Sequence, residues 1–316
     1  MPAAPNHPLR AITAVVTAMV LLSVQDMTVK WMSDSYPLHQ VMLVRASVAT
    51  LIILLIMRVE IGWRGLRTSR PGAHLARSLL TVLANSTYFL GVAVMPLAEA
   101  MAVFFVAPLL ITALSALLLR DPVGPRRWTA VAIGLTGVIM ILRPGAEAVS
   151  LVALLPLAGA CAYAAMQIIT RRLGTTDPAS TMAFYIQMTF IAVSTTMYLI
   201  AGDGALAHGA DPALQFLLRE WITPTPRDGA IMVAVGVVNG AVSYLLSQAY
   251  RSAEPSLVAP FEYTALPLAV GLGFLVFGDI PDTQASLGIV LIIGSGLYAM
   301  YRETVRRRQR AEKQSG

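Results

Sequence analysis

FFVAPLLITALSALLLRDP, residues 104–122, is an apolar run with a proline near its start, and it closes on Asp-Pro. A related run, PFEYTALPLAVGLGFLVFGDIP, lies at residues 260–281. The internal proline of the first run, Pro108, matches Pro267 of the second run, 159 positions later. Because about 20 apolar residues suffice to cross a bilayer as a helix, we interpret the two runs as equivalent membrane helices in a duplicated chain.

The composition of the whole chain is that of a membrane protein. Hydrophobic residues make up 56% of its 316 residues and charged residues only 13%, whereas soluble domains carry about 25% charge. The single cysteine excludes an intrachain disulfide, and the four histidines fall in the N-terminal tail, in loops or at a helix end. We therefore expect neither a metal site nor a cofactor.

We predict an all-α polytopic membrane protein with ten helices, separated by joints in which proline and glycine are frequent. The predicted helices lie near residues 9–33, 38–60, 75–95, 97–119, 126–142, 150–173, 180–201, 228–251, 256–277 and 284–303. The long loop at residues 202–227 contains DPALQFLLREW, in which Asp211 and Pro212 suit a helix start. This stretch predicts a short helix in the membrane interface, with an apolar face of Leu214, Leu217, Leu218 and Trp221.

The duplication extends to other helices. Pro37 matches Pro178 and Lys30 matches Arg171, in each case 141 positions apart. Each half then holds five helices, and an odd number makes the second half enter the membrane from the opposite side. This is the inverted-topology arrangement of many secondary transporters, whose substrate site lies near the midplane. The predicted divisions are a first repeat at 1–145, a second repeat at 146–303 and a basic tail at 304–316.

The distribution of Lys and Arg predicts the orientation. With both termini in the cytoplasm, 18 of the 23 basic residues lie inside, and the outer loops keep only Arg143, Arg219 and Arg227. This asymmetry accounts for the net charge of +6 without a nucleic-acid partner. The C-terminal RETVRRRQRAEK is expected to lie over anionic headgroups. The expected partners are the lipid bilayer and a small-molecule substrate, and homodimer formation stays open.

Two long segments carry a resemblance to a known family: LSALLLRDPVGPRRWTAVAIGLTGVIMILRPG, residues 114–145, and VAPFEYTALPLAVGLGFLVFGDIPDTQASLGIVLIIGSGLYAMYRE, residues 258–303. They closely resemble the two repeats of the EamA branch of the drug/metabolite transporter superfamily, and the resemblance covers residues 10–303. It implies ten helices in two inverted repeats, located in the bacterial inner membrane. Family members move amino acids, riboflavin, S-adenosylmethionine or metallophores. One departure is Arg120-Asp121, where the family usually has Gly-Glu.

Charged residues inside membrane helices cost about 2.5–3.5 kcal/mol on insertion scales and mark functional sites by default. Asp26 and Arg45 both lie roughly 10–12 Å below the outer surface, at a rise of 1.5 Å per residue. Because consecutive antiparallel helices are expected neighbours, we predict that the two residues form an ion pair. The pair either only locks the first two helices together, or it is the place where substrate or a proton competes.

Three further residues are candidates for coupling or gating: Glu262, Pro108 and Pro267. Glu262 is a candidate carboxylate for proton coupling, and the alternative is a salt bridge to Arg251. Pro108 and Pro267 each remove a backbone amide and free the carbonyl group four residues earlier. Kinks at matched positions suit a moving gate, or they are purely structural.

Polar and aromatic side chains recur near mid-depth in several helices. Asn85 and Tyr88 share a face by a spacing of three, and Asn239 and Ser243 share one by a spacing of four. Any one of them alone could serve to join helices. Together they predict a polar cavity for a planar, amide-rich substrate, formed by Gln25, Asn85, Tyr88, Gln167, Asn239, Ser243, Tyr244, Gln248 and Tyr263.

The predicted function is secondary transport by alternating access. The resemblance of AYRSAEPSLVAPFEYTAL, residues 249–266, favours uptake of a vitamin- or nucleoside-like solute such as riboflavin or S-adenosylmethionine. Export of amino acids, for example aromatic ones, or of related metabolites stays an alternative, and so does a scaffold or sensor that transports nothing. An intramembrane enzyme would need a constellation such as His-Glu-x-x-His or a serine with a histidine base. The sequence contains no such constellation, so we expect no enzyme.

Overall fold

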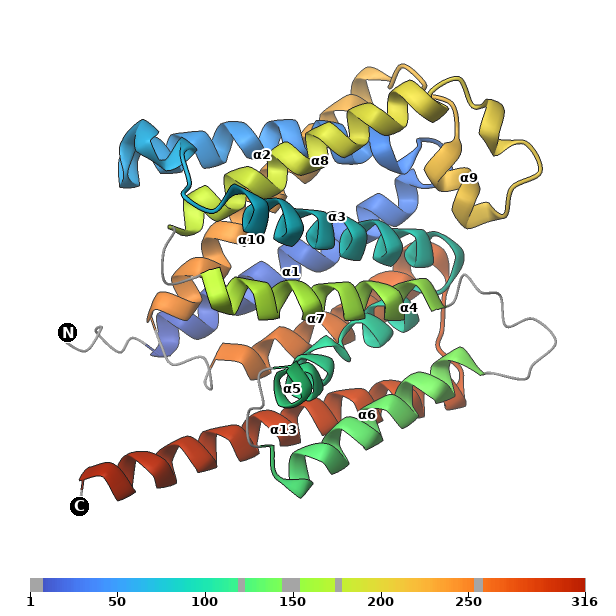
Figure 1. Ribbon diagram of the computed structural model, residues 1–316. Helices are drawn as coiled ribbons and strands as arrows, with labels where there is room; N and C mark the ends of the chain where they lie inside the picture. Colours follow the sequence, from blue (N-terminus) through green and yellow to red (C-terminus); the bar gives the residue numbers. More distant parts are fainter. Residues whose placement is uncertain (1–7, 119–122, 144–153, 174–177, 253–257, 316) are drawn as a thin grey trace. The chain divides into compact units, whose positions relative to one another are not determined.

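The computed structural model describes residues 8–118, 123–143, 154–173, 178–252 and 258–315 (Figure 1). Throughout these residues the secondary structure is helical, without strands. Several side chains within the helices are not described, among them that of the predicted cavity residue Gln248. Arg120 and Asp121, where the sequence departs from the family pattern, also lie outside the described residues.

The α-helices are α1 (Pro8–Met32), α2 (Leu38–Glu60), α3 (Pro71–Val94), α4 (Leu97–Phe104), α5 (Ala107–Leu118), α6 (Pro125–Leu142), α7 (Leu155–Leu173), α8 (Ala179–Ala201), α9 (Pro212–Leu218), α10 (Pro226–Ser252), α12 (Ala265–Leu272) and α13 (Thr283–Ser315). The tighter 3₁₀ turns are η1 (Gly62–Leu66), η3 (Ala205–Ala207) and η4 (Ala259–Thr264), and η5 (Gly273–Phe277) is a π-helical turn. α13 continues to Ser315, well past the predicted end at residue 303, because Arg, Glu and Lys of the basic tail are good helix formers.

Seven segments in the described part of the chain are long and apolar enough to cross a membrane: Leu9–Met32, Leu38–Glu60, Leu97–Leu118, Ser180–Ala201, Pro226–Leu246, Pro260–Phe277 and Thr283–Arg302. Three predicted spans are not among them. The apolar part of α7, Leu155–Thr170, is shorter. α3 carries several buried polar side chains, and α6 begins with two arginines. The count of ten membrane helices therefore stays a prediction.

Two of the spans are interrupted near their prolines. α4 ends at Phe104 and α5 begins at Ala107, because Pro108 has no amide to donate to the Phe104 carbonyl group. The tight turn between them is closed by the amide of Val106, which donates to the carbonyl oxygen of Val103 at 3.3 Å. In the matched helix, η4 changes to α12 between Thr264 and Ala265, close to the carbonyl group that Pro267 leaves free.

The chain forms two compact units. Unit 1 consists of Met1–Ser23, Pro96–Val149 and Val242–Gly316, and unit 2 consists of Val24–Met95 and Ser150–Ala241. α1 and α10 each contribute residues to both units. Each unit therefore contains helices from both predicted repeats, and the repeat boundaries themselves stay a prediction.

In unit 1, α6 and α13 lie side by side and run antiparallel (Figure 1). Gly137 meets Gly288, whereas the earlier Gly134 meets the later Ser295. The contact at the glycines is reciprocal: an added Cβ on either one would lie 2.7 Å from the carbonyl oxygen of the other. At the end of the helices, Arg143 forms an ion pair with Asp282. The amide of Ala285 and this arginine hold the pKa of Asp282 below its usual value.

In unit 2, α3 packs on α7 and α2 packs on α8 (Figure 1). α3 and α7 are antiparallel, because Gly91 meets Pro156 while the earlier Arg77 donates from Nε to Thr170 Oγ1 at 2.7 Å. An added Cβ at Gly91 would lie 2.3 Å from Pro156 Cγ. Small residues thus let the two backbones approach, as is usual where membrane helices pack closely.

The predicted short helix in the loop at residues 202–227 is present as α9, but its buried face differs from the prediction. Ala213 and Phe216 are buried, whereas Leu214 is 44% exposed. α9 packs against α3. The side of α9 that is buried is therefore not the apolar face that the sequence predicted. The loop is also joined to the start of α2, where Gln40 Nε2 donates to the carbonyl oxygen of Ile222 at 2.6 Å.

The joint between α1 and α2 is fastened to α10 at the same end of unit 2. The Tyr36 hydroxyl donates to Asp228 Oδ2 at 2.7 Å. This hydrogen bond raises the pKa of Tyr36. In addition, Arg219 Nη1 donates to the carbonyl oxygen of Ser33 at 3.0 Å.

Replacing Gly288 by alanine is expected to destabilise unit 1, because the new methyl group collides with the Gly137 carbonyl group. Overpacking of this kind costs about 1–3 kcal/mol. Gly294→Ala on the same helix is the matched control, since an added Cβ there meets nothing within 4 Å. Thermal unfolding of the purified protein in detergent should show a lower midpoint for Gly288→Ala only. Equal midpoints would contradict the close contact.

Candidate polar site in unit 2

Asp26 is buried in unit 2, on the part of α1 that follows Ser23. Its side chain is 4% exposed, and its Oδ2 accepts a hydrogen bond of 2.7 Å from the hydroxyl of Tyr88 on α3. Tyr88 itself is 6% exposed. α1 and α3 are therefore joined by a polar contact inside the protein and not at a lipid-facing surface.

Arg45 on α2 is 3% exposed and is held on several sides. Its Nη2 donates to Asn85 Oδ1 on α3 at 3.1 Å. Its guanidinium carbon lies 5.7 Å from the ring centroid of Phe89 on α3 and 5.3 Å from that of Phe190 on α8. Cation–π contacts at this range are worth about 2 kcal/mol or more when they are desolvated. We call Asp26, Arg45, Asn85, Tyr88, Phe89 and Phe190 the Arg45 cluster.

Asp26 and Arg45 attract each other electrostatically, as predicted, but not through a contact at salt-bridge distance. Among the residues that the structure describes, these two form no direct salt bridge, and each is instead bonded to α3. Tyr88 and Asn85 are three residues apart, so they project from one face of α3. α3 is thus hydrogen-bonded to the carboxyl group of α1 through Tyr88 and to the guanidinium group of α2 through Asn85.

Three polar atoms near the cluster have no hydrogen-bond partner. They are Gln25 Oε1, Arg45 Nε and Gln187 Oε1, and each belongs to a side chain that is at least nine-tenths buried. Gln25 adjoins Asp26, and Gln187 lies one turn before Phe190 on α8. A buried polar group without a partner costs about 1–3 kcal/mol. Two acceptors and one donor are therefore left unsatisfied inside unit 2.

The other predicted cavity residues of unit 2 do not belong to the cluster. Gln167 on α7 donates from Nε2 to the Tyr163 hydroxyl at 2.8 Å, one turn away on the same helix. Asn239 on α10 is half-buried. Both contribute polar side chains to unit 2, and a role in substrate binding stays a prediction for each.

The remaining predicted residues belong to unit 1. Ser243 and Tyr244 are exposed on α10, Glu262 is half-buried in η4, and Pro108 and Pro267 lie in α5 and α12. Tyr263 is 4% exposed, and its hydroxyl has no hydrogen-bond partner.

Tyr263 is positioned by its neighbours in unit 1. Its ring lies 5.5 Å from that of Phe105, at the α4–α5 interruption. Gly296 on α13 provides the room for its hydroxyl, which would lie 1.9 Å from an added Cβ. The two interrupted helices therefore meet at an aromatic contact.

Sequence reasoning did not assign Phe89 and Phe190 to the site. Phe89 follows Asn85 by four residues, and this spacing places both on one helix face, so the sequence held a signal for it. Phe190 held none, because its contact with Arg45 depends on how α8 packs on α2. In the described residues, no group of three or more His, Cys, Asp or Glu side chains is placed to hold a metal ion.

Tyr88→Phe is expected to lower the stability of unit 2, because it removes the hydroxyl that satisfies the buried Asp26. Hydrogen bonds to charged groups contribute about 1.5–3 kcal/mol. Tyr198→Phe on α8 is the matched control, since Tyr198 is 46% exposed. Thermal unfolding in detergent checks the difference between the two variants. An equal effect would show that the Tyr88 hydroxyl carries no structural weight.

The chain is similar to a known protein family and to several named proteins. Residues 9–143 match the EamA-like transporter family. The chain is 30% identical over 252 residues to a protein named riboflavin transporter from Rhizobium johnstonii, covering 80% of this chain and 78% of that relative. It is 24% identical over 286 residues to an S-adenosylmethionine uptake transporter from Rickettsia prowazekii, covering 90% of each.

The chain is also similar to a protein that is named an exporter and to one solved structure. The chain is 26% identical over 282 residues to a pseudopaline exporter from Pseudomonas aeruginosa, covering 88% of this chain and 91% of that relative. A solved structure titled only as the crystal structure of a protein has the same fold, with a TM-score of 0.63, 20% identity and coverage of 93% and 98%. On the strength of the family match and of a relative that is 30% identical over most of both lengths, this multi-pass membrane chain belongs to the EamA-like transporter family.

Proposed function

We propose that this protein takes up riboflavin, or a similar planar, amide-rich solute, by alternating access. The observation that carries the proposal is the Arg45 cluster, where a buried guanidinium lies between two aromatic rings and three buried polar atoms lack partners. A buried charge in a membrane protein is costly and marks a functional site by default. The name of one relative, a riboflavin transporter, supports the same class of solute.

A flavin-like ring system suits the chemistry of the cluster. Its flat face can stack beside Phe89 and Phe190, and its carbonyl groups can accept a hydrogen bond from Arg45 Nε. Its imide N–H can donate to the free oxygen of Gln25 or Gln187. Such a ligand would satisfy the buried atoms that the protein leaves without partners, and this gain offsets the cost of removing the ligand from water.

The proposed mechanism is that two inverted five-helix repeats rock around the site and expose it to each side in turn. The proline interruptions at Pro108 and Pro267 supply positions where helices can bend. The proposed location is the bacterial inner membrane, with both termini in the cytoplasm, as the distribution of Lys and Arg favours. Uptake is the proposed direction because the S-adenosylmethionine relative is named an uptake transporter. The pseudopaline relative is named an exporter, and export is therefore the alternative.

The first test is riboflavin uptake into proteoliposomes that contain the purified protein. Arg45→Gln should lower the initial rate about tenfold or more, because a lost hydrogen bond to a charged group is worth about 1.5–3 kcal/mol and 1.4 kcal/mol corresponds to tenfold. Ser47→Ala, an exposed change two residues away on α2, should leave the rate unchanged.

Because Arg45→Gln can impair folding, Phe190→Leu provides a second variant that keeps the charge. It should weaken uptake while the protein still elutes as a monodisperse peak in size-exclusion chromatography. Absence of flux for riboflavin, S-adenosylmethionine and aromatic amino acids alike would refute the transporter proposal. Flux of one of the latter two would refute only the choice of substrate.

The coupling proposal has a separate test in the same vesicles, with and without an imposed pH gradient. Asp26→Asn and Glu262→Gln remove the two candidate carboxyl groups but retain their size. If either group carries the coupled proton, its variant should transport at a rate that no longer responds to the gradient. A response identical to that of the unchanged protein would assign both carboxyl groups a packing role.

A further inference from the structure

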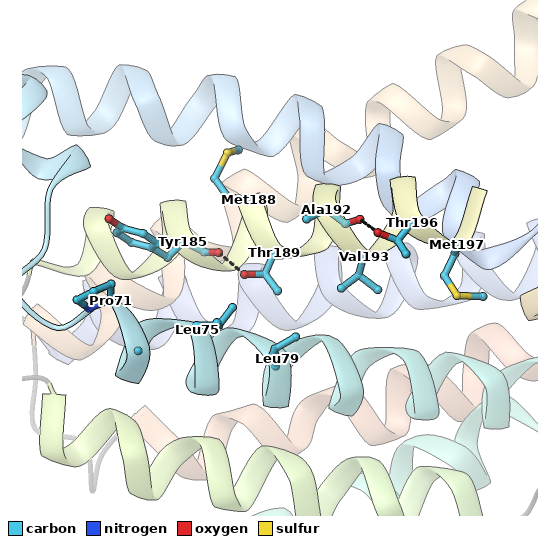
Figure 2. Close-up of a pocket in the computed structure, with 11 residues that line it drawn as sticks. Pro71, Leu75, Leu79, Tyr185, Met188, Thr189, Ala192, Val193, Thr196 and Met197 are labelled. Carbon is cyan, nitrogen blue, oxygen red and sulfur yellow. Dashed lines mark hydrogen bonds between the residues drawn. The ribbon is translucent and has the colours of Figure 1, made fainter. Parts of the chain in front are cut away.

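An open groove runs between α3 and α8 in unit 2, with a cavity volume of about 580 Å³ (Figure 2). Its chemistry differs from that of the Arg45 cluster, because its walls are almost wholly apolar. The lining residues of α3 are Pro71, Gly72, Leu75 and Leu79, and those of α8 include Tyr185, Thr189, Val193 and Met197.

The groove presents hydrocarbon and offers few polar groups. Leu75 and Leu79 are 55% and 46% exposed and point toward α8 (Figure 2). The two threonine hydroxyls on the α8 wall are satisfied by their own helix: Thr189 Oγ1 donates to the Tyr185 carbonyl oxygen and Thr196 Oγ1 to the Ala192 carbonyl oxygen, each at 2.9 Å. On a membrane-spanning helix such a surface meets lipid hydrocarbon, and a groove in it has the chemistry to hold an acyl chain.

One end of the groove adjoins a cationic turn. η1 and the residues that follow it carry Arg64, Arg67 and Arg70, all exposed, and Pro71 and Gly72 of the groove come directly after them. Among the described residues, none of these three side chains takes part in an ion pair that the structure records. We call Arg64, Arg67 and Arg70 the arginine turn.

The arginine turn is fixed to the groove by side chains of α8. Thr181 Oγ1 donates to the carbonyl oxygen of Gly65 at 2.9 Å, and the Tyr185 hydroxyl donates to that of Leu66 at 3.0 Å. Tyr185 is also part of the groove wall. The positive charges and the apolar groove therefore form one continuous surface, held by two buried or half-buried hydrogen bonds.

The length of the groove matches one leaflet of a bilayer. From Tyr185 to Met197 the wall spans twelve residues, which is about 18 Å at 1.5 Å per residue. Half of a hydrocarbon core of about 30 Å is about 15 Å. An acyl chain that enters beside the arginine turn would therefore fill the groove to roughly the middle of the membrane.

We propose that this surface is a binding site for an anionic phospholipid, with one acyl chain in the groove between α3 and α8 and the phosphate on the arginine turn. Arg side chains are well suited to phosphate because their fork of N–H groups can bind two oxygens at once. In the orientation proposed above, the turn faces the cytoplasmic leaflet, where anionic lipids concentrate. The site does not depend on which solute is transported.

The test measures lipid retention by the full-length protein in detergent, by native mass spectrometry. Phosphatidylglycerol and phosphatidylcholine with identical acyl chains are the two probes. We expect phosphatidylglycerol to be retained preferentially. The double variant Arg67→Glu and Arg70→Glu should lower its affinity about 25-fold or more, which is roughly fivefold for each arginine. The double variant Arg10→Glu and Arg126→Glu, at exposed arginines of unit 1, should retain the preference.

The groove has its own pair of variants on α8. Ala192→Trp should fill the groove and reduce retention of both lipids, whereas Thr195→Trp, outside the lining, should not. Equal retention of the two lipids would overturn the proposal, as would a preference that survives charge reversal at Arg67 and Arg70. A dimer in the native spectrum that disappears with Ala192→Trp would also overturn it, because a second copy would then be the occupant of the groove.

Discussion

The burial of the Arg45 guanidinium is the constraint on which the arrangement of unit 2 depends. Removing such a charge from water costs several kcal/mol unless its donors and its positive charge are matched. Asn85 provides an acceptor, and the rings of Phe89 and Phe190 provide electron-rich faces. These partners come from α3 and α8, and Tyr88 of α3 extends the network to α1. One side chain thus fixes how four helices face one another.

α3 combines polar contacts with close packing. Asn85 and Tyr88 bond the charged side chains of α2 and α1, while Gly91, and Ala84 opposite Gly159, allow α7 to approach closely. The polar residues that build the site also make α3 less apolar than the segments that qualify as membrane spans. The same helix is therefore weak as an isolated span and central to unit 2, where neighbouring helices satisfy its polar groups.

The sequence was sufficient to place the helices and the charged residues, because apolar length, proline and spacing are local signals. It predicted α2 at residues 38–60, as observed, and it singled out Asp26, Arg45, Asn85 and Tyr88. It did not predict how they are joined, since equal depth suggested a direct ion pair, whereas each side chain is hydrogen-bonded to α3. The sequence also did not predict the groove between α3 and α8, because the spacing between two packed helices depends on the tertiary structure.

The predicted repeat supports the proposal that the cluster binds a ligand in addition to joining helices of unit 2. Two pairs of helices that match between the predicted repeats pack on each other, α2 on α8 and α6 on α13. Features that both helices of a pair have in common therefore contribute to helix packing. At the spacing of 141 residues, Arg45 corresponds to Ile186 and Asp26 to Gln167. The second half thus forms the equivalent helices without either charge. Because the second half forms its equivalent helices without these charges, ligand binding is our proposed reason for their presence, in addition to the contacts that Arg45 makes within unit 2.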